Sequence, residues 1–294
     1  MNLNSKTFSL KIFNQRLPFI YIFFNALYRG LLTNKKMLDK DILKYHRSGY
    51  VKPDINMREE IEEYKDKFFI EKRDNTEDTK QSDLSLSDYD KKNFIIKIKK
   101  KLKPLIDKLE NYFDCNVYIS DVKLTRNHKY DDKDDLKKEY YSNHFHQDSY
   151  LITYNKIFVN LMDISENDGP LEIIPNENRN SFLKSFNYKD RNRYNPLGDQ
   201  NLIYKNIGKM GDCFLFCSPR VFHRAGVPKN YRDNMTIIIA TIPKNKFKEL
   251  NIDNEISLFN NNYQFYQKFT KPYSIINVIK LFIFFCKNKL YKKL

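Results

Sequence analysis

The segment Phe145-His-Gln-Asp148 places an imidazole and a carboxylate two residues apart, and a second histidine follows 75 residues after the aspartate. Two imidazoles and one carboxylate can occupy one face of an octahedral metal ion and leave three positions open, as in non-haem Fe(II) oxygenases. A basic residue comes nine positions after the second histidine and begins a run rich in β-branched residues. A cation fixed beside an open iron can bind the far carboxylate of a dicarboxylate cosubstrate. From His146, Asp148, His223 and Arg232 we predict a 2-oxoglutarate-dependent oxygenase.

The sequence around this motif predicts strands that can orient the side chains of the motif. A His-x-Asp pair is a weak signal by itself, because it occurs by chance and a single histidine near a strand end is more often a core or surface residue. Here the pair precedes a strand pattern over 156–164, and turns feed further apolar strands at 168–175 and 211–216. The last of these strands leads to His223. A rigid sheet can hold ligands just beyond its strand ends, so this context favours metal binding.

Other residues compete for the same roles. His144 lies on the same side of an extended segment as His146, but a His-Phe-His pair supplies no carboxylate at its second position. Asp163 is the rival carboxylate, and it lies at the far end of a predicted strand. Two basic residues upstream of the motif are the next candidates after Arg232 for binding the cosubstrate, namely Lys123 and Arg126.

A set of motifs follows in a fixed order along the middle of the chain. They are Phe-His-Gln-Asp at 145–148, Asn-Asp-Gly-Pro-Leu-Glu-Ile-Ile-Pro at 167–175, Gly-Asp-Cys-Phe-Leu-Phe at 211–216, and His-Arg-Ala-Gly at 223–226 followed by Tyr-Arg-Asp. Upstream, His46-Arg-Ser-Gly-Tyr-Val51 precedes an acidic helix. In order and spacing the set resembles the phytanoyl-CoA dioxygenase family of 2-oxoglutarate/Fe(II) oxygenases, over residues 37–245. The motifs are specific as a set and weak one by one.

This resemblance implies a mainly β fold with flanking helices and a double-stranded β-helix core of the jelly-roll or cupin type. It implies that His146, Asp148 and His223 bind the iron and that Arg232 binds the cosubstrate carboxylate. The cofactors would be Fe(II), 2-oxoglutarate and O₂, with no catalytic residue beyond the metal site. The family usually continues its proline with Gly-Ser-His, whereas Asn-Glu-Asn-Arg-Asn follows Pro175 here. That loop tends to lie near the substrate, so the identity of the substrate stays open.

The carboxylate of Asp148 bears on the reaction type. Related halogenases lack this carboxylate so that chloride can bind iron, and its presence favours hydroxylation of a small-molecule or lipid-linked substrate. A catalytically silent binding module of the same fold and an oxygenase that acts on nucleic acid are the alternatives. Release of succinate would exclude the silent binding module. A salt-dependent mobility shift of DNA or RNA would support the oxygenase that acts on nucleic acid. No nucleic acid is expected as a partner, because phosphate binding needs basic residues clustered at the site.

The net charge of +15 is concentrated at the two ends of the chain. Residues 1–36 contain six Lys and Arg residues, residues 256–294 contain seven lysines, and neither stretch contains an Asp or Glu. The middle of the chain is therefore nearly neutral. A chain of this length can form one sizeable core with extensions. We accordingly expect a basic, apolar extension at 1–36, an oxygenase domain at 37–250 and a second basic, apolar extension at 251–294.

Each extension carries an apolar run, at 17–32 and at 275–286, that is shorter than the ~20 residues a spanning helix needs. Flanking Lys and Arg suit interfacial helices on an anionic membrane, whereas packing on the core or in a homodimer interface would also bury these runs. The N-terminal run lacks a small-residue cleavage site, which disfavours a signal peptide. Cysteines at 115, 213, 217 and 286 show no disulfide or metal spacing and fit a reducing compartment. We expect a cytoplasmic protein, with membrane contact on the cytoplasmic face or homodimer packing as the role of its ends.

Between the extensions, hydrophobic periodicity predicts the secondary structure. Helices are expected over 39–69, a mobile loop over 73–92, and a helix over 91–113 whose apolar stripe packs on a sheet. Alternating apolar residues predict a strand at 117–124. The charged segment 127–143 leads into the His-x-Asp motif and is expected to form a loop that can act as a lid.

Deleting residues 273–294 is expected to release the chain from anionic liposomes and to leave 2-oxoglutarate binding intact. Each Lys or Arg near an anionic surface contributes about 1 kcal/mol, so a cluster of lysines adds to the insertion of the apolar run. Co-sedimentation with liposomes measures the release. If the full-length chain never binds liposomes and the shortened chain aggregates or unfolds early, the segment packs on the core or between subunits instead.

Overall fold

The computed structural model describes residues 39–71, 80–113, 116–130, 140–146, 148, 155–175, 202–218 and 221–242. Both predicted extensions, at 1–36 and 251–294, lie outside the described residues, and so does the middle of the predicted lid at 127–143. The predicted boundaries of the oxygenase domain therefore stay predictions.

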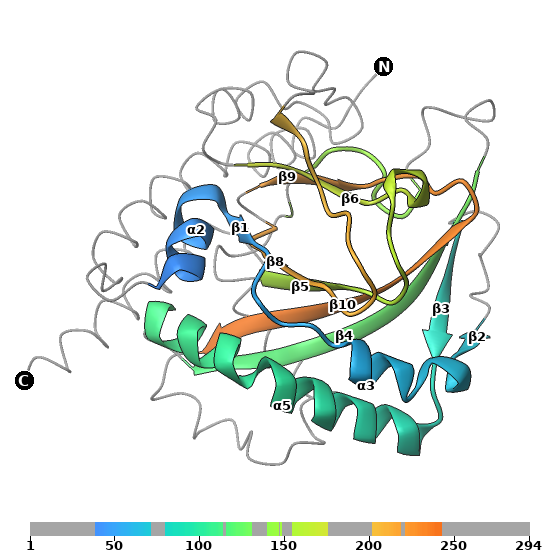
Figure 1. Cartoon of the computed structure of the whole chain (residues 1–294), viewed down its shortest axis with the longest axis horizontal. Helices are drawn as coiled ribbons and strands as arrows, with labels where there is room; N and C mark the ends of the chain where they lie inside the picture. The colour runs from blue at the N-terminus through green and yellow to red at the C-terminus, as the bar shows by residue number, and fades with distance from the viewer. Residues whose placement is uncertain are drawn as a thin grey trace, which may run out of the picture.

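The described chain begins with helices and then forms mainly strands (Figure 1). In chain order the elements are α2 (Lys40–Ser48), β1 (Tyr50–Val51), α3 (Arg58–Glu62), η2 (Lys65–Lys67), β2 (Phe69–Glu71), β3 (Gln81–Ser85), α5 (Asp88–Phe113), β4 (Asn116–His128), β5 (Asn155–Asn160), η3 (Glu166–Asp168), β6 (Leu171–Ile174), β7 (Tyr204–Lys205), β8 (Cys213–Phe216), β9 (Phe222–Ala225) and β10 (Tyr231–Ile242).

The strands form two sheets. The larger has the order β1-β8-β5-β10-β4-β3-β2 and the smaller the order β7-β6-β9. From β4 onward the chain alternates between the two sheets. Strands β4, β5, β8 and β10 lie in the larger sheet. The segments between them lie on the smaller side: the bridge at His146 comes between β4 and β5, β6 and β7 come between β5 and β8, and β9 comes between β8 and β10. Antiparallel strands that alternate between two sheets in this way form a jelly roll. The predicted mainly β fold with flanking helices and a double-stranded β-helix core is confirmed.

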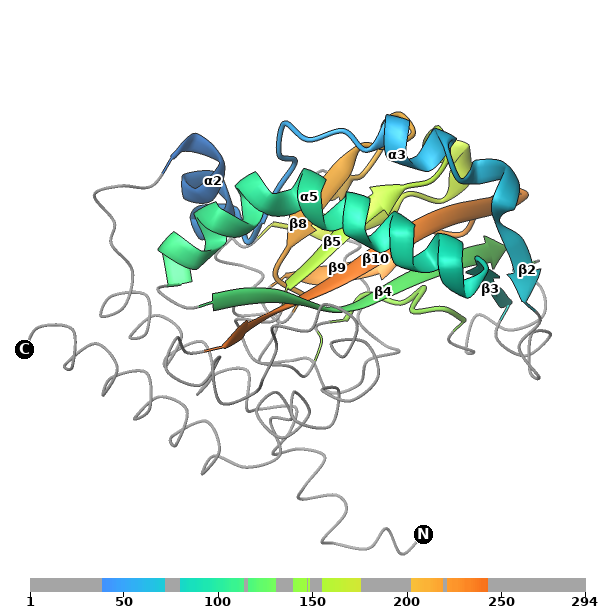
Figure 2. The same ribbon diagram turned by 90° about the horizontal axis from the view of Figure 1, so that it is seen from below.

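The main hydrophobic core lies between α5 and the larger sheet, whose outer face this helix covers (Figures 1 and 2). Its buried members include Phe94, Ile98, Leu102, Leu105 and Leu109 of α5, and Val117, Ile119, Ile157, Val159, Leu215, Met235 and Ile237 of the strands. Because side chains alternate along a strand, the residues between these strand positions point to the opposite face, toward the smaller sheet. There a second cluster joins Phe158, Phe214 and Phe216 to Leu171 and Ile173 of β6.

Short sequence signals fix the ends of individual elements. The Asp39 side chain accepts a hydrogen bond from the Ile42 amide at 2.9 Å and caps α2, which ends at Gly49 with φ of 81°. Gly211 has φ of +88°, and a Cβ atom there would lie 2.3 Å from the backbone nitrogen of Arg58. Glycine therefore allows the tight turn that starts β8, as the Gly-Asp-Cys motif predicts.

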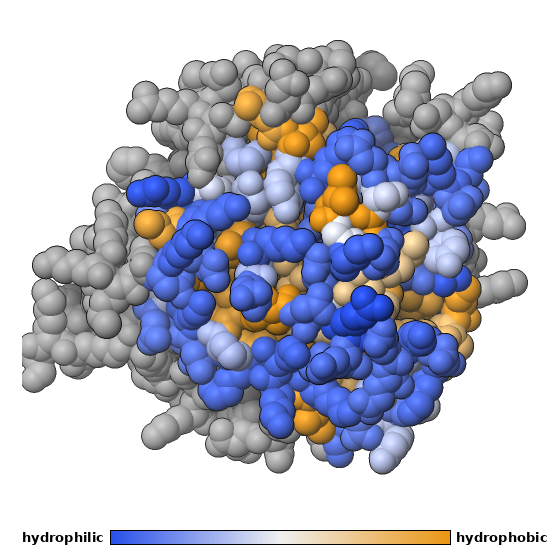
Figure 3. Space-filling view, in the orientation of Figure 1, coloured by the Kyte–Doolittle hydropathy of each residue, from blue (hydrophilic) through white to orange (hydrophobic). Residues whose placement is uncertain are grey.

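The described surface seen in the orientation of Figure 1 is mainly hydrophilic, with small, separate apolar patches (Figure 3). No helix among the described residues is both long enough and apolar enough to cross a membrane.

Several predicted elements differ from the structure. The helix predicted at 91–113 is confirmed and begins at Asp88, whereas the strand predicted at 156–164 already ends at Asn160. The prediction of a loop over 73–92 is wrong over Gln81–Ser85, which forms β3, and over 88–92, which belongs to α5. Four of the five residues of this strand are polar, and its single apolar residue, Leu84, is buried in the core. One apolar residue gives no alternating pattern in the sequence, whereas the backbone of this segment pairs with β2 and β4.

Replacing Leu102 by Ala is expected to lower the free energy of unfolding by about 2–5 kcal/mol, because it removes a side chain that α5 buries completely against the sheet. Lys103→Ala is the matched control: its side chain is 72% exposed and pairs with Asp107 four residues on, so about 0.5 kcal/mol or less should be lost. Urea unfolding measures both values. Equal losses for the two variants would contradict the placement of α5.

Candidate metal centre

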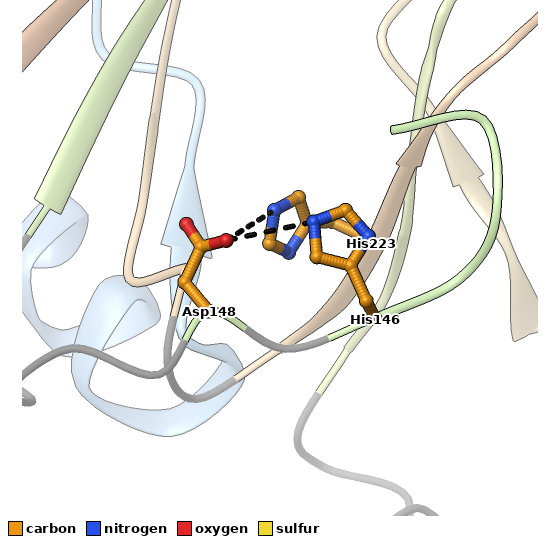
Figure 4. A group of neighbouring side chains, drawn as sticks. All are labelled: His146, Asp148 and His223. Carbon is orange, nitrogen blue, oxygen red and sulfur yellow. Dashed lines mark ion pairs between the residues drawn. The ribbon is translucent and has the colours of Figure 1, made fainter. Parts of the chain in front are cut away.

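His146, Asp148 and His223 come together, although 75 residues separate the second and third of them. The Oδ1 atom of Asp148 lies 3.5 Å from Nε2 of His146 and 3.9 Å from Nε2 of His223 (Figure 4). The two imidazole rings have centroids 4.4 Å apart. One carboxylate oxygen and two ring nitrogens therefore face a common point.

Backbone hydrogen bonds hold these three residues in place. His146 and His223 form an antiparallel bridge, in which each amide donates to the carbonyl of the other residue at 3.0 and 2.9 Å. The amide of Asp148 donates to the carbonyl of Ser218 at 3.2 Å. Residues paired across a bridge present their side chains on the same face, so this pairing brings the two imidazoles together. The ligands were expected just beyond strand ends, but His223 lies inside β9 because the strand itself forms the bridge.

Each candidate histidine is oriented through its other ring nitrogen. The Nδ1 atom of His146 lies 2.7 Å from the carbonyl oxygen of His144, and Nδ1 of His223 lies 3.2 Å from that of Val221. A carbonyl oxygen can only accept, so these contacts assign the proton to Nδ1 and leave the Nε2 lone pair free. Metal-binding histidines are usually held in this way. His144, the rival imidazole, contributes its backbone carbonyl to this arrangement.

Asp148 lies in a strongly polar setting inside the protein. Its Oδ2 atom is 2.6 Å from Nζ of Lys156 on β5. Burial acts to raise the pKa of Asp148, but the Lys156 ammonium and then the two histidines outweigh it and hold this pKa well below the usual range. Burial and the neighbouring His146 lower the pKa of His223 well below its ordinary value. Asp148 is thus ionised and His223 neutral at neutral pH, as metal ligands must be.

The geometry fits a metal ion. Donor atoms about 2.1 Å from one ion are roughly 3.0–3.4 Å apart on an octahedron or tetrahedron, close to the separations of Oδ1 from the two Nε2 atoms. Two imidazoles and one carboxylate, with positions left for other ligands, form the donor set of non-haem Fe(II) sites.

Arg232 is a buried cation with spare hydrogen-bond donors. Its exposed fraction is 1%, and it lies on the inner face of β10, with the guanidinium carbon 5.9 Å from the centre of the Phe158 ring. Nη1 donates to the carbonyl of Gly226 at 3.4 Å, and Nε has no hydrogen-bond partner among the described residues. Burial lowers the pKa of Arg232 to about 10, so the side chain is charged at neutral pH. An ionised, under-bonded guanidinium suits a carboxylate that binds from outside.

Three buried asparagines near Arg232 were not singled out from the sequence. Asn234 follows Arg232 on the same face of β10, and Asn160 on β5 is its cross-strand partner. Asn206 donates from Nδ2 to Oδ1 of Asn160 at 3.4 Å. Each of the three has one side-chain polar atom without a hydrogen-bond partner in the described part of the chain. Polar residues at alternate positions of a strand were the available signal, because asparagine is depleted in strands.

The other candidate residues from the sequence lie in different settings. Asp163 pairs with Lys209 at 2.9 Å and has a side chain that is 59% exposed. Arg126 forms two hydrogen bonds with Asp233, at 2.7 and 2.6 Å, so its charge is already neutralised. Lys123 is 54% exposed. Among the described residues, Asp163 does not belong to the group of His146, Asp148 and His223.

Comparisons with known proteins give similarity in structure but not in sequence. No family model matches the chain, and no curated protein matches its sequence. The non-haem α-ketoglutarate-dependent epimerase SnoN from nogalamycin biosynthesis is 14% identical with a TM-score of 0.46, over 71% of this chain and 84% of SnoN. HygX from Streptomyces hygroscopicus, with nickel and 2-oxoglutarate bound, is 12% identical with a TM-score of 0.48, over 69% and 86%. EctD from S. alaskensis with bound iron is 14% identical with a TM-score of 0.45, over 72% and 81%.

Similarity at these identities and TM-scores carries no argument about activity. The fold rests on the strand order described above, and the site rests on its own geometry. The resemblance to the phytanoyl-CoA dioxygenase family stays a prediction, because no family model matches.

Proposed function

We propose that this chain is an Fe(II)/2-oxoglutarate-dependent dioxygenase that hydroxylates a small-molecule or lipid-linked substrate. The group of His146, Asp148 and His223, with both Nε2 atoms and one carboxylate oxygen facing a common point, is the observation that carries this proposal. An ionised carboxylate and two imidazoles that are oriented by backbone carbonyls form a donor set suited to Fe(II).

Arg232 supports the second half of the proposal. It and the candidate metal ligands border the same apolar cluster, since the ring of His223 lies 5.2 Å from that of Phe216 and Arg232 lies over Phe158. A guanidinium at this place can form two parallel hydrogen bonds to the 5-carboxylate of 2-oxoglutarate. The cosubstrate would then reach from Arg232 to the metal across the cluster.

The residues of this chain would have different roles at the site. His146, Asp148 and His223 hold the metal and leave positions open on it, while Arg232 orients the cosubstrate. Phenylalanines of the inner cluster exclude water, which strengthens charge interactions inside the site. When bound, iron would supply the oxidising chemistry, in which O₂ and 2-oxoglutarate would give succinate and CO₂ and the second oxygen atom would enter the substrate.

The roles of the two ends of the chain stay proposals from the sequence. We propose that 37–250 forms the oxygenase domain and that 1–36 and 251–294 serve membrane contact or homodimer formation. The charge and the apolar runs of these ends support this division. Liposome binding by the chain that lacks residues 273–294 tests this division of roles.

His146→Ala and Asp148→Ala are each expected to weaken Fe(II) binding by at least ~100-fold and to abolish succinate release, because each removes one of three ligands. Metal content after anaerobic reconstitution and succinate formation measure the two effects. His144→Ala and Asp163→Ala are the matched controls and should retain iron. Unchanged iron content in both ligand variants would show that the assignment is wrong.

Arg232→Met is expected to raise the free energy of unfolding of the ligand-free protein by about 1–2 kcal/mol, since it replaces a buried cation that has no ion-pair partner in the described part of the chain by an apolar side chain of similar length. Saturating 2-oxoglutarate with Ni(II) should stabilise the wild-type chain by about 2–3 kcal/mol beyond Ni(II) alone and leave this variant unchanged. Thermal unfolding with and without the cosubstrate measures both effects.

Arg126→Met is the control for this experiment. It leaves Asp233 without its partner, so it should lower stability and keep the response to 2-oxoglutarate. A full response in the Arg232 variant would identify another cation as the cosubstrate partner.

A further inference from the structure

Lys156 is a cation placed directly beside the candidate metal ligands. It lies on β5 and points to the inner face of the sheet, opposite to the residues of this strand that pack under α5. Its cross-strand neighbour is Phe216. Its side chain is 21% exposed, and its Nζ atom lies 2.6 Å from Oδ2 of Asp148. Among the described residues, Lys156 is the basic side chain that pairs with this carboxylate. A lysine here has a cost, because an ammonium and a divalent ion on one carboxylate repel each other.

The two oxygens of Asp148 have different partners. Oδ1 faces the Nε2 atoms of His146 and His223, whereas Oδ2 faces Lys156. The backbone of Asp148 is tied to Ser218 through its amide. Rotation about the side-chain bonds of Asp148 decides which oxygen faces the histidines, and the ion pair with Lys156 restricts this rotation.

We propose that Lys156 is a positioning residue that holds Asp148 as a ligand through one oxygen and so keeps a coordination position of the metal open. This inference rests on the proposed function. An octahedral ion has six positions, of which three go to protein ligands and two to the cosubstrate, which leaves one for O₂. Carboxylates also bind metals through both oxygens. With Oδ2 bound to the metal, the last position would be filled, and Lys156 prevents this by occupying Oδ2.

The number of water molecules on a bound metal tests this role directly. The full-length protein is loaded with Mn(II), and the waters on the ion are counted from the line broadening of its EPR spectrum in ¹⁷O-enriched water. Wild type and Lys156→Arg, which keeps the charge, should show about three waters, and Lys156→Met about two. With 2-oxoglutarate added, about one should remain in wild type and none in Lys156→Met. Metal affinity alone cannot decide, because removing the ammonium also removes its repulsion of the ion.

Lys123→Met is the matched control, since Lys123 is an exposed lysine on β4, and its water count should equal that of wild type. If Lys156→Met does not fold, Lys156→Gln replaces it, with the same expected loss of one water. A count of about three in Lys156→Met, or in Lys156→Gln where it replaces that variant, would overturn the proposal for Lys156. If His146→Ala loses Mn(II) in the same experiments, the metal site itself stands. If His146→Ala retains Mn(II), the proposed function fails instead.

Discussion

The pair of backbone hydrogen bonds between His146 and His223 is the interaction on which the rest of the site depends. It closes the smaller side of the jelly roll and brings two imidazoles from distant parts of the chain onto one face. Asp148 follows two residues later, where its amide bonds to Ser218 and its carboxylate can turn toward both rings. A shift of one residue in this pairing would point His223 away from the site, because side chains alternate along a strand.

Strand β10 serves the core and the site at the same time. Met235, Ile237 and Ile239 pack in the core under α5, whereas Arg232 and Asn234 face the smaller sheet. The inner face carries a charge and polar side-chain atoms that lack hydrogen-bond partners among the described residues, which opposes folding. The outer face offsets this cost by burying apolar area. Burial of apolar side chains on the outer face of β10 therefore compensates for the buried polar groups on its inner face. Such polar groups are typical of a site that binds a polar ligand.

Much of the site and the fold class could be predicted from the sequence, because both rest on local patterns. The motif around His146 and the β-branched run after Arg232 are continuous in sequence, and the jelly roll follows from the resemblance that they carry. Lys156 and Asn206 could not be predicted, since their importance depends on which strands become neighbours. Strand β3 was missed for a related reason: four of its five residues are polar, and its pairing with β4 joins segments that are far apart in the sequence. Sequence patterns indicate which side chains are buried, but they do not indicate which residues of neighbouring strands pair with each other.

A metal ion bound at this site would also act as a crosslink. It would join the chain at 148 to the chain at 223 and so enclose a loop of 75 residues. A covalent bond that closes a loop of this length lowers the entropy of the unfolded chain, with an effect on the order of 4 kcal/mol. An ion that binds the folded chain alone shifts the folding equilibrium in the same direction. A metal bound there would thus stabilise the folded chain as well as complete the candidate site.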